Sequence, residues 1–224
     1  MRFIRDGFCS VKGEKMKYIC KRTNEYLEID GRLHKPVWGN AVEVSLKDNS
    51  TGKAPPRDTF VRLMWNDRFL YAGFRCQYET INATLTEFND KLYNEDVVEI
   101  FIDDDRDKKT YIEIEINPLN AVLHYSIHNN PGRRIVAFAR TEQVIQSAVI
   151  IDEINKTFFV EMAIPFTEFA TAGSIPPNPY DTWLFNLYRI DREVNGPIRY
   201  SALSPTGQDN FHMPSAFIEI EFGI

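Results

Sequence analysis

Apolar residues alternate with other residues along most of this chain, with the period of two that is typical of β-strands. The clearest case is 111–117, where Ile112, Ile114 and Ile116 point to one face and the residues between them to the other. Helical periodicity is scarce, and one short helical turn is expected near 164–169. The pattern predicts strands over 59–65, 69–77, 97–103, 111–117, 122–128, 133–139, 143–151, 157–164, 182–190, 198–203 and 216–222.

Clusters of Pro, Gly, Asn and Asp separate the predicted strands at spacings typical of a sandwich or jelly roll. We therefore expect an all-β fold, a β-sandwich of the jelly-roll or immunoglobulin-like kind with two antiparallel sheets. The most linker-like segment, 175–180, is followed at once by a strongly patterned strand, so we interpret it as a loop. The prediction is one domain over residues 1–224.

Composition and charge narrow the class of partner. The chain has 224 residues, 43% of them hydrophobic, and a net charge of −6, which disfavours nucleic acid and anionic membranes because both require clustered Lys and Arg. No run approaches the roughly 20 apolar residues of a membrane-spanning helix. The N-terminus, Met1 to Gly7, lacks the apolar region of a signal peptide, so no leader is expected. The location stays open, with the cytoplasm favoured.

Two predicted strands carry carboxylates on the face opposite their isoleucines. Glu113 and Glu115 share that face of 111–117, and Glu99 lies on the corresponding face of 97–103. If these strands pair, three carboxylates gather beside aromatic residues on the open face of a sheet. Carboxylates accept hydrogen bonds from hydroxyl groups and aromatic rings stack on sugars, so this face suits a carbohydrate. An ordinary solvated acidic face is the alternative.

Five segments, in order, resemble the motifs of family 9 carbohydrate-binding modules and their stand-alone, DOMON-like relatives. Each is short, but together they cover about residues 27–222. The segments are Ile29-Asp30-Gly31-Arg32-Leu33 with Pro36-Val37-Trp38, Val61 to Asp67 with Leu70-Tyr71, Asp96 to Asp103, Trp183-Leu184-Phe185-Asn186, and Phe211 to Phe217.

The resemblance implies a bacterial β-sandwich that grips a sugar, or the end of a sugar chain, between two aromatic rings. It assigns these rings to Tyr93 and Phe211, where the family usually has tryptophan. Its polar ligand contacts correspond to Glu99, Glu113, Glu115 and Gln208, with His212 beside the second ring. Glu113 and Glu115 stand where the family carries Gln and Arg, so the ligand is expected to differ. Core packing is expected for Trp38, Trp65 and Trp183.

An acidic run offers a candidate metal site. Asp103, Asp105 and Asp107 have the alternate spacing of a calcium loop, but Lys108 and Ile114 occupy the positions where an EF-hand needs Gly and Glu. Because the resembled family holds structural calcium, we expect either a looser calcium site or a plain acidic turn. No other cofactor is expected.

Three functions follow, in this order. The first is non-catalytic binding of a mono- or oligosaccharide in carbohydrate catabolism. The second is a glycoside hydrolase that uses the paired glutamates, since Glu113 and Glu115 would stand about 7 Å apart on one strand. The third is a sandwich domain that binds proteins. We expect the chain not to be an enzyme.

Overall fold

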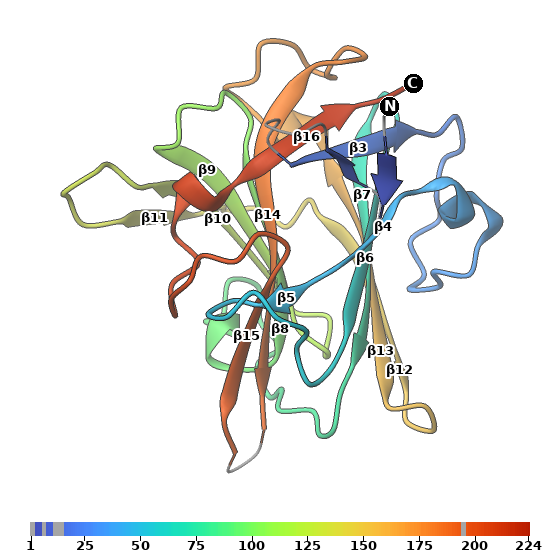
Figure 1. The fold of residues 1–224 in the computed structure, drawn as a ribbon, viewed down its shortest axis with the longest axis vertical. Coiled ribbons are helices and arrows are strands. Elements are labelled where there is room, and N and C mark those ends of the chain that lie inside the picture. The colour runs from blue at the N-terminus through green and yellow to red at the C-terminus, as the bar shows by residue number, and fades with distance from the viewer. Residues whose placement is uncertain (1–2, 6–7, 11–15, 194–195) are drawn as a thin grey trace.

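The computed structural model describes residues 3–5, 8–10, 16–193 and 196–224, and it is an all-β structure (Figure 1). The expectation of no leader rests on Met1 to Gly7, of which Met1, Arg2, Asp6 and Gly7 lie outside the described residues. No helix among the described residues is long and apolar enough to span a membrane.

Sixteen strands and four short 3-10 helices make up the described chain. The strands are β1 (Phe3–Arg5), β2 (Phe8–Ser10), β3 (Lys17–Arg22), β4 (Glu43–Ser45), β5 (Lys47–Asp48), β6 (Thr59–Trp65), β7 (Phe69–Gln77), β8 (Val97–Asp103), β9 (Thr110–Ile116), β10 (Val122–His128), β11 (Val136–Ala139), β12 (Gln146–Asp152), β13 (Thr157–Pro165), β14 (Thr182–Arg192), β15 (Ile198–Ala202) and β16 (Ile218–Phe222). The 3-10 helices are η1 (Pro36–Asn40), η2 (Leu92–Asn94), η3 (Phe166–Glu168) and η4 (Pro214–Ala216).

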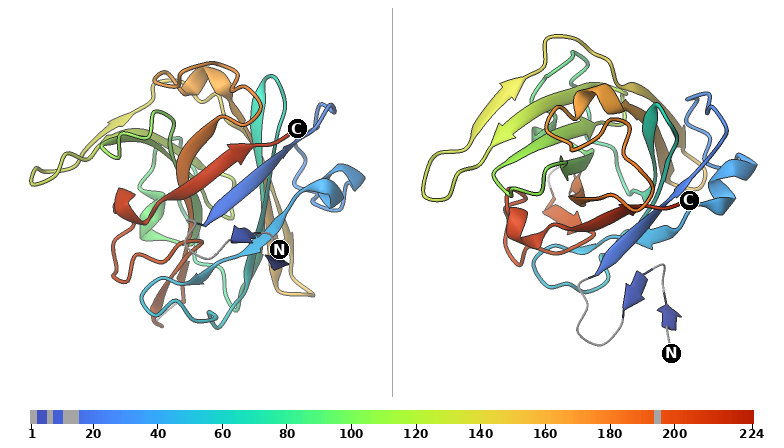
Figure 2. Two further views of the ribbon diagram at one scale, coloured as in Figure 1. Left: turned by 45° about the horizontal axis from the view of Figure 1, so that its top comes forward. Right: turned by 90° about the horizontal axis from the view of Figure 1, so that it is seen from above.

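The strands follow one hydrogen-bonded path, in the order β11-β10-β9-β8-β14-β16-β3-β6-β7-β13-β12. Two antiparallel halves can be distinguished, β11 to β16 and β6 to β12, and they curl around a shared interior (Figure 2). Strand β3 joins them, and it pairs in parallel with β16 on one side and with β6 on the other. The expected all-β class is confirmed, while the two halves are linked by this parallel strand into one path.

The predicted strand bounds match the structure closely where the alternation is strongest. The segments 59–65, 69–77, 97–103 and 122–128 are strands with those bounds. The predicted strand 133–139 is shorter, because β11 begins at Val136. The short turn expected near 164–169 is η3. Strands β3, β4 and β5 were not predicted.

The interior between the two halves is apolar. The even-numbered residues of β8 and β9, including Ile100 and Ile114, pack there with Leu63, Phe74 and Phe158 of the other half. The three tryptophans expected in the core are buried, with exposures of 0% for Trp38, 0% for Trp65 and 3% for Trp183.

The opposite face of β8 and β9 is also covered, which contradicts the expectation of an open, solvated sheet face. All seven residues of β8 are buried. A second apolar cluster lies on this face and includes Leu92 of η2 together with Phe211 and Phe217 of the segment that follows β15. Segments distant in sequence roof the sheet, so alternation within the strands could not predict the cover.

The first resembled motif forms a polar frame around one buried carboxylate. Glu161 on β13 is fully buried and accepts hydrogen bonds from the backbone N–H groups of Asp30 (2.9 Å) and Gly31 (3.0 Å). Trp38 Nε1 donates to Glu161 Oε1 at 2.9 Å, and Lys35 Nζ lies 2.7 Å from the same oxygen. Gly31 has a φ of +82°, a conformation that favours glycine. The motif therefore fastens the chain before β4 to the sheet.

Candidate functional site

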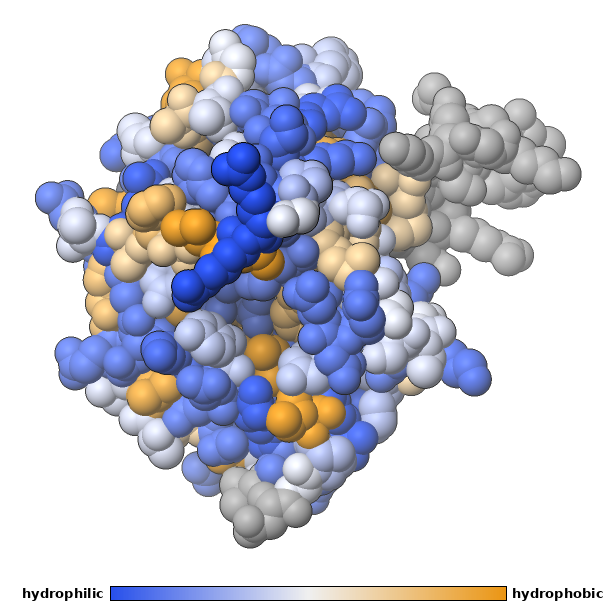
Figure 3. All heavy atoms as spheres, turned by 90° about the vertical axis from the view of Figure 1, so that its left-hand side faces the viewer, coloured by the Kyte–Doolittle hydropathy of each residue, from blue (hydrophilic) through white to orange (hydrophobic). Residues whose placement is uncertain are grey.

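A pocket of about 390 Å³ lies on the roofed face of β8, β9 and β10. This volume is within the range of small-molecule sites. The side of the molecule that carries β9, β10 and β11 is hollowed near its centre (Figure 3). The pocket is lined by Tyr93, Asn94, Glu99, Phe101, Glu113, Glu115, Tyr125, Ile127, Ile135, Ala137, Ile190, Arg192, Tyr200, Asp209, Asn210, Phe211 and His212.

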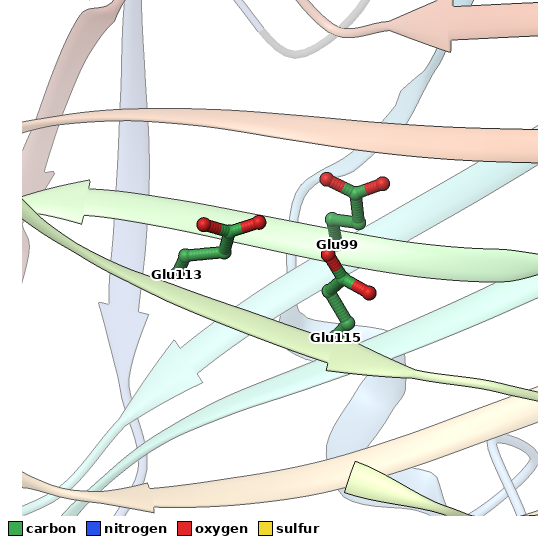
Figure 4. Close-up of side chains that lie close together, drawn as sticks. All are labelled: Glu99, Glu113 and Glu115. Carbon is green, nitrogen blue, oxygen red and sulfur yellow. The ribbon is translucent and has the colours of Figure 1, made fainter. Parts of the chain in front are cut away.

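Three glutamates from two adjacent strands form the polar part of this lining. Glu99 on β8 and Glu115 on β9 are direct cross-strand partners, and Glu113 is paired with Phe101. On its other side Glu113 is paired with Tyr125 of β10. Figure 4 shows the three side chains on one face of the sheet, and carboxylate oxygens from all three lie within 4.8 Å of one another. The expected gathering of Glu99, Glu113 and Glu115 on one face is confirmed by this register.

These carboxylates are far more buried than the sequence indicated. Their residues are 2%, 5% and 0% exposed for Glu99, Glu113 and Glu115. Both carboxylate oxygens of Glu115 and Oε1 of Glu99 are buried without a hydrogen-bond partner. None of the ion pairs among the described residues includes any of the three. Buried ionisable groups are normally paired, so this set is unusual.

Burial shifts the protonation of the cluster. It raises the pKa of Glu113 to about 7. It raises the pKa of Glu115 well above its usual value, and the neighbouring charges of Glu99 and Glu113 add to that rise. The pKa of Glu99 is raised for the same reasons, burial first and then the charge of Glu113. Ionising all three carboxyls at neutral pH therefore requires a compensating positive charge.

The two rings assigned by resemblance both line the pocket, in different ways. Tyr93 is half-buried at the end of η2, and its carbonyl oxygen accepts a hydrogen bond from Arg192 Nη2 at 3.0 Å. Phe211 is 8% exposed and lies in the second apolar cluster. Tyr200 packs edge-on against Phe211, with centroids 5.6 Å apart. Tyr93 thus forms an accessible wall, whereas Phe211 is also part of the core.

His212 and Gln208 differ in their relation to the pocket. His212 lines it, and its Nδ1 lies 2.8 Å from the hydroxyl of Tyr111, while Asn129 Nδ2 donates to the His212 carbonyl at 3.0 Å. Burial lowers the pKa of His212 to about 4, so its ring is neutral at pH 7. Gln208 does not line the pocket; its side chain is exposed and its Nε2 contacts Met213 Sδ.

Four lining residues were not singled out in the sequence. Tyr125 is opposite Glu113 on β10, Tyr200 belongs to β15, and Asp209 and Asn210 are exposed residues before Phe211. The tyrosines lie in strands that alternation predicted, but the strand order needed to place them beside the glutamates is not visible in a single sequence.

The candidate calcium residues lie in the turn between β8 and β9. Carboxylate oxygens of Asp103, Asp105 and Asp107 lie within 4.8 Å of one another. Backbone N–H groups satisfy part of this set: Lys108 donates to Asp103 Oδ2 at 2.9 Å and Thr110 to Asp107 Oδ1 at 2.8 Å. Asp103 Oδ1 is buried without a partner, and burial raises the pKa of Asp103 to about 6. The donor set of carboxylate oxygens fits a hard cation.

Comparison with protein families gives a match across most of the chain. A family model described as carbohydrate family 9 binding domain-like matches residues 29–217. Endo-1,4-β-xylanase A of Thermoanaerobacterium saccharolyticum is 29% identical over 173 residues, which cover 75% of this chain and 13% of the xylanase. The chain thus corresponds to a small part of that curated relative.

Solved structures share the fold at low sequence identity. A putative carbohydrate-binding protein from Bacteroides uniformis superposes with a TM-score of 0.75 at 15% identity, covering 93% of this chain and 100% of that one. A carbohydrate-binding module of family 9 from Caldicellulosiruptor kristjanssonii, solved in complex with cellotriose, gives a TM-score of 0.68 at 17% identity and covers 92% of this chain and 93% of that one. The module from the same organism in complex with glucose gives 0.65 at 16% identity, over 93% and 96% of the two chains.

Proposed function

This chain belongs to the carbohydrate family 9 binding domain-like family, and on that premise we propose that it binds a mono- or oligosaccharide without cleaving it. The observation that carries the proposal is the pocket itself, about 390 Å³ in volume, with aromatic walls and buried carboxylates. Rings stack on the C–H faces of a pyranose and carboxylates accept from its hydroxyl groups. Structures of the same fold were solved with cellotriose and with glucose, which supports a ligand of this class.

The proposed contacts divide between walls and floor. Tyr93 and Phe211 provide rings on the pocket wall, and Tyr125 and Tyr200 extend the aromatic lining. Glu99, Glu113 and Glu115 provide acceptors. We propose that His212 contributes its neutral ring and that Gln208, whose side chain lies outside the lining, contributes only through its backbone.

The glycoside hydrolase alternative finds less support. A retaining hydrolase needs two carboxyls about 5–5.5 Å apart, one of them held ionised, and an inverting enzyme needs a wider gap of about 6.5–9.5 Å for water. Here oxygens of all three carboxyls lie within 4.8 Å of one another, and burial raises the pKa of each. The matched family is a binding-domain family, which favours a binding protein that is not an enzyme.

The test is titration calorimetry with a panel of mono- and oligosaccharides against wild-type protein and Tyr93→Ala. Tyr93 is half-buried, so the variant is expected to fold while losing at least about tenfold in affinity, the loss of one stacked ring. Tyr26→Ala, at an exposed tyrosine outside the pocket, is the matched control and should bind normally. Equal affinity of Tyr93→Ala and wild type would refute the proposed site.

Two finer features belong to the same proposal. We propose that residues of about 27–222 act as one binding domain, with the halves β11 to β16 and β6 to β12 as the two layers of a sandwich. We also propose a structural calcium ion at Asp103, Asp105 and Asp107. The unpartnered buried oxygen of Asp103 supports it, because a cation would supply the missing partner.

A further inference from the structure

The buried glutamate cluster lacks a positive partner. Glu115 is fully buried, both of its carboxylate oxygens are unpartnered, and it lines the pocket rather than the core between the halves. Arg192 also lines the pocket, but its Nη2 donates to the Tyr93 carbonyl and it forms no ion pair with the cluster. Protein groups in the described chain therefore leave these acceptors for a ligand to satisfy.

The spacing of the cluster identifies the kind of donor that fits. Oxygens of Glu99, Glu113 and Glu115 lie within 4.8 Å of one another. A point equidistant from three oxygens so spaced lies at most about 2.8 Å from each, which is the length of a charge-assisted N–H···O bond. An ammonium group has three N–H donors on one atom and no acceptor. One protonated primary amine can therefore satisfy all three carboxylates.

Two other occupants fit less well. A sugar hydroxyl has a single proton to donate, so one hydroxyl cannot serve three converging carboxylates. A calcium ion takes six to eight oxygen ligands, whereas the lining around these glutamates is largely aromatic, including Phe101, Tyr125 and Phe211. Aromatic faces stabilise an ammonium group as well as a pyranose ring. The lining thus combines a place for a charge with surfaces for a ring.

We propose that this pocket is specific for an amine-bearing sugar, a hexosamine with a free primary amine, whose ammonium group is held by Glu99, Glu113 and Glu115. This inference rests on the proposed carbohydrate binding and specifies its ligand class. The aromatic walls contact the sugar ring and the glutamate cluster contacts the amine. The site differs from one for a neutral sugar in a single respect, namely that ligand charge is required.

The experiment compares glucosamine, N-acetylglucosamine and glucose, each alone and as short β-1,4-linked oligosaccharides, by titration calorimetry in phosphate buffer at pH 7. N-acetylation removes the charge while keeping the ring, so it is the matched ligand control. The free amine is expected to bind at least about tenfold more tightly than both neutral sugars. Glu115→Gln, which preserves shape, should remove that preference, and Glu153→Gln at an exposed site should retain it.

Each outcome is decisive for a different claim. Neutral sugars that bind as tightly as the amine overturn the amine inference and leave carbohydrate binding standing. Failure of every sugar overturns both. Saturable binding of Ca²⁺ or Mn²⁺ alone that Glu115→Gln abolishes, together with no preference for the amine, assigns the cluster to a metal and also overturns the inference. If Glu115→Gln is unfolded by circular dichroism, Glu99→Gln replaces it under the same criteria.

Discussion

The ring of Phe211 stacks on the ring of Tyr188, with centroids 4.1 Å apart and planes inclined by 15°. The hydroxyl of Tyr188 also donates to the Phe211 carbonyl at 3.0 Å. A ring expected from resemblance to grip ligand therefore also closes the second apolar cluster. Phe211 joins ligand binding to the stability of the roof over β8 and β9.

Phe211→Ala should consequently lose stability as well as affinity. Truncating a buried phenylalanine costs about 3–5 kcal/mol, which corresponds to a fall in melting temperature of roughly 6–20 °C in a domain of this size. Thermal melts monitored by circular dichroism, with Tyr93→Ala beside it, measure the difference. An unchanged melting temperature for Phe211→Ala would show that its ring packs against nothing essential.

The raised pKa values of the glutamate cluster predict a pH-dependent stability. A carboxyl whose pKa is higher when folded stabilises the protein below its unfolded value, near 4.3, and that stability is lost as pH rises through the folded value. Burial raises the pKa of Glu113 to about 7 and that of Glu115 well above normal. The melting temperature should fall from pH 7 to pH 8.5, by about 1.4 kcal/mol per pH unit for each proton involved.

Glu115→Gln isolates the source of that pH dependence. His212, whose pKa burial lowers to about 4, is neutral above pH 7 when folded and adds little there. Removing one ionisable member should flatten the curve and raise the melting temperature at pH 8.5 by a few degrees. Parallel melting curves for the variant and wild type across this range would mean that the cluster does not titrate in it.

Glu161→Ala should unfold the frame rather than alter the ligand. The change leaves Lys35 Nζ, Trp38 Nε1 and the backbone N–H of Gly31 without their shared acceptor. Removing one partner of a buried charged pair costs about 3–5 kcal/mol. Urea unfolding of Glu161→Ala and of Glu153→Ala, an exposed control, checks the value. A loss no greater than that of the control would show that this hydrogen-bond network contributes nothing.

The proposed calcium site predicts a stabilisation that depends on the metal. Adding millimolar CaCl₂ after chelation should raise the melting temperature, since a ligand that binds only the folded state adds about 2.7 kcal/mol at one hundred times its dissociation constant. Asp103→Asn should abolish this response, because Asp103 supplies the buried unpartnered oxygen. Identical melts with EDTA and with Ca²⁺ would remove the site.

Local alternation predicted the strands well where both neighbours are antiparallel hairpin partners. The bounds of β6 and β7 follow from their own residues and from the turn at Asn66, whose Oδ1 accepts the N–H groups of Arg68 and Phe69. Strand β3 was missed because it pairs in parallel with two strands distant in sequence, and its burial pattern depends on them.

The candidate site was predicted in its members but not in its environment. The hairpin of β8 and β9 placed Glu99 opposite Glu115, and this follows from neighbouring strands. Burial of these glutamates comes from η2 and from the segment around Phe211, which approach from elsewhere in the chain. Their loss of solvent and the resulting pKa shifts could not be derived from strand periodicity.

The fastening of Asp30, Gly31 and Trp38 to Glu161 has a consequence for how such proteins are sorted. The segment by which the chain is recognised is architectural, and it lies on strands that do not line the pocket. Likeness in that segment groups proteins by scaffold and says little about diet. Relatives are better catalogued by the charges they place at the positions of Glu99, Glu113 and Glu115, since those positions decide which molecule is retained.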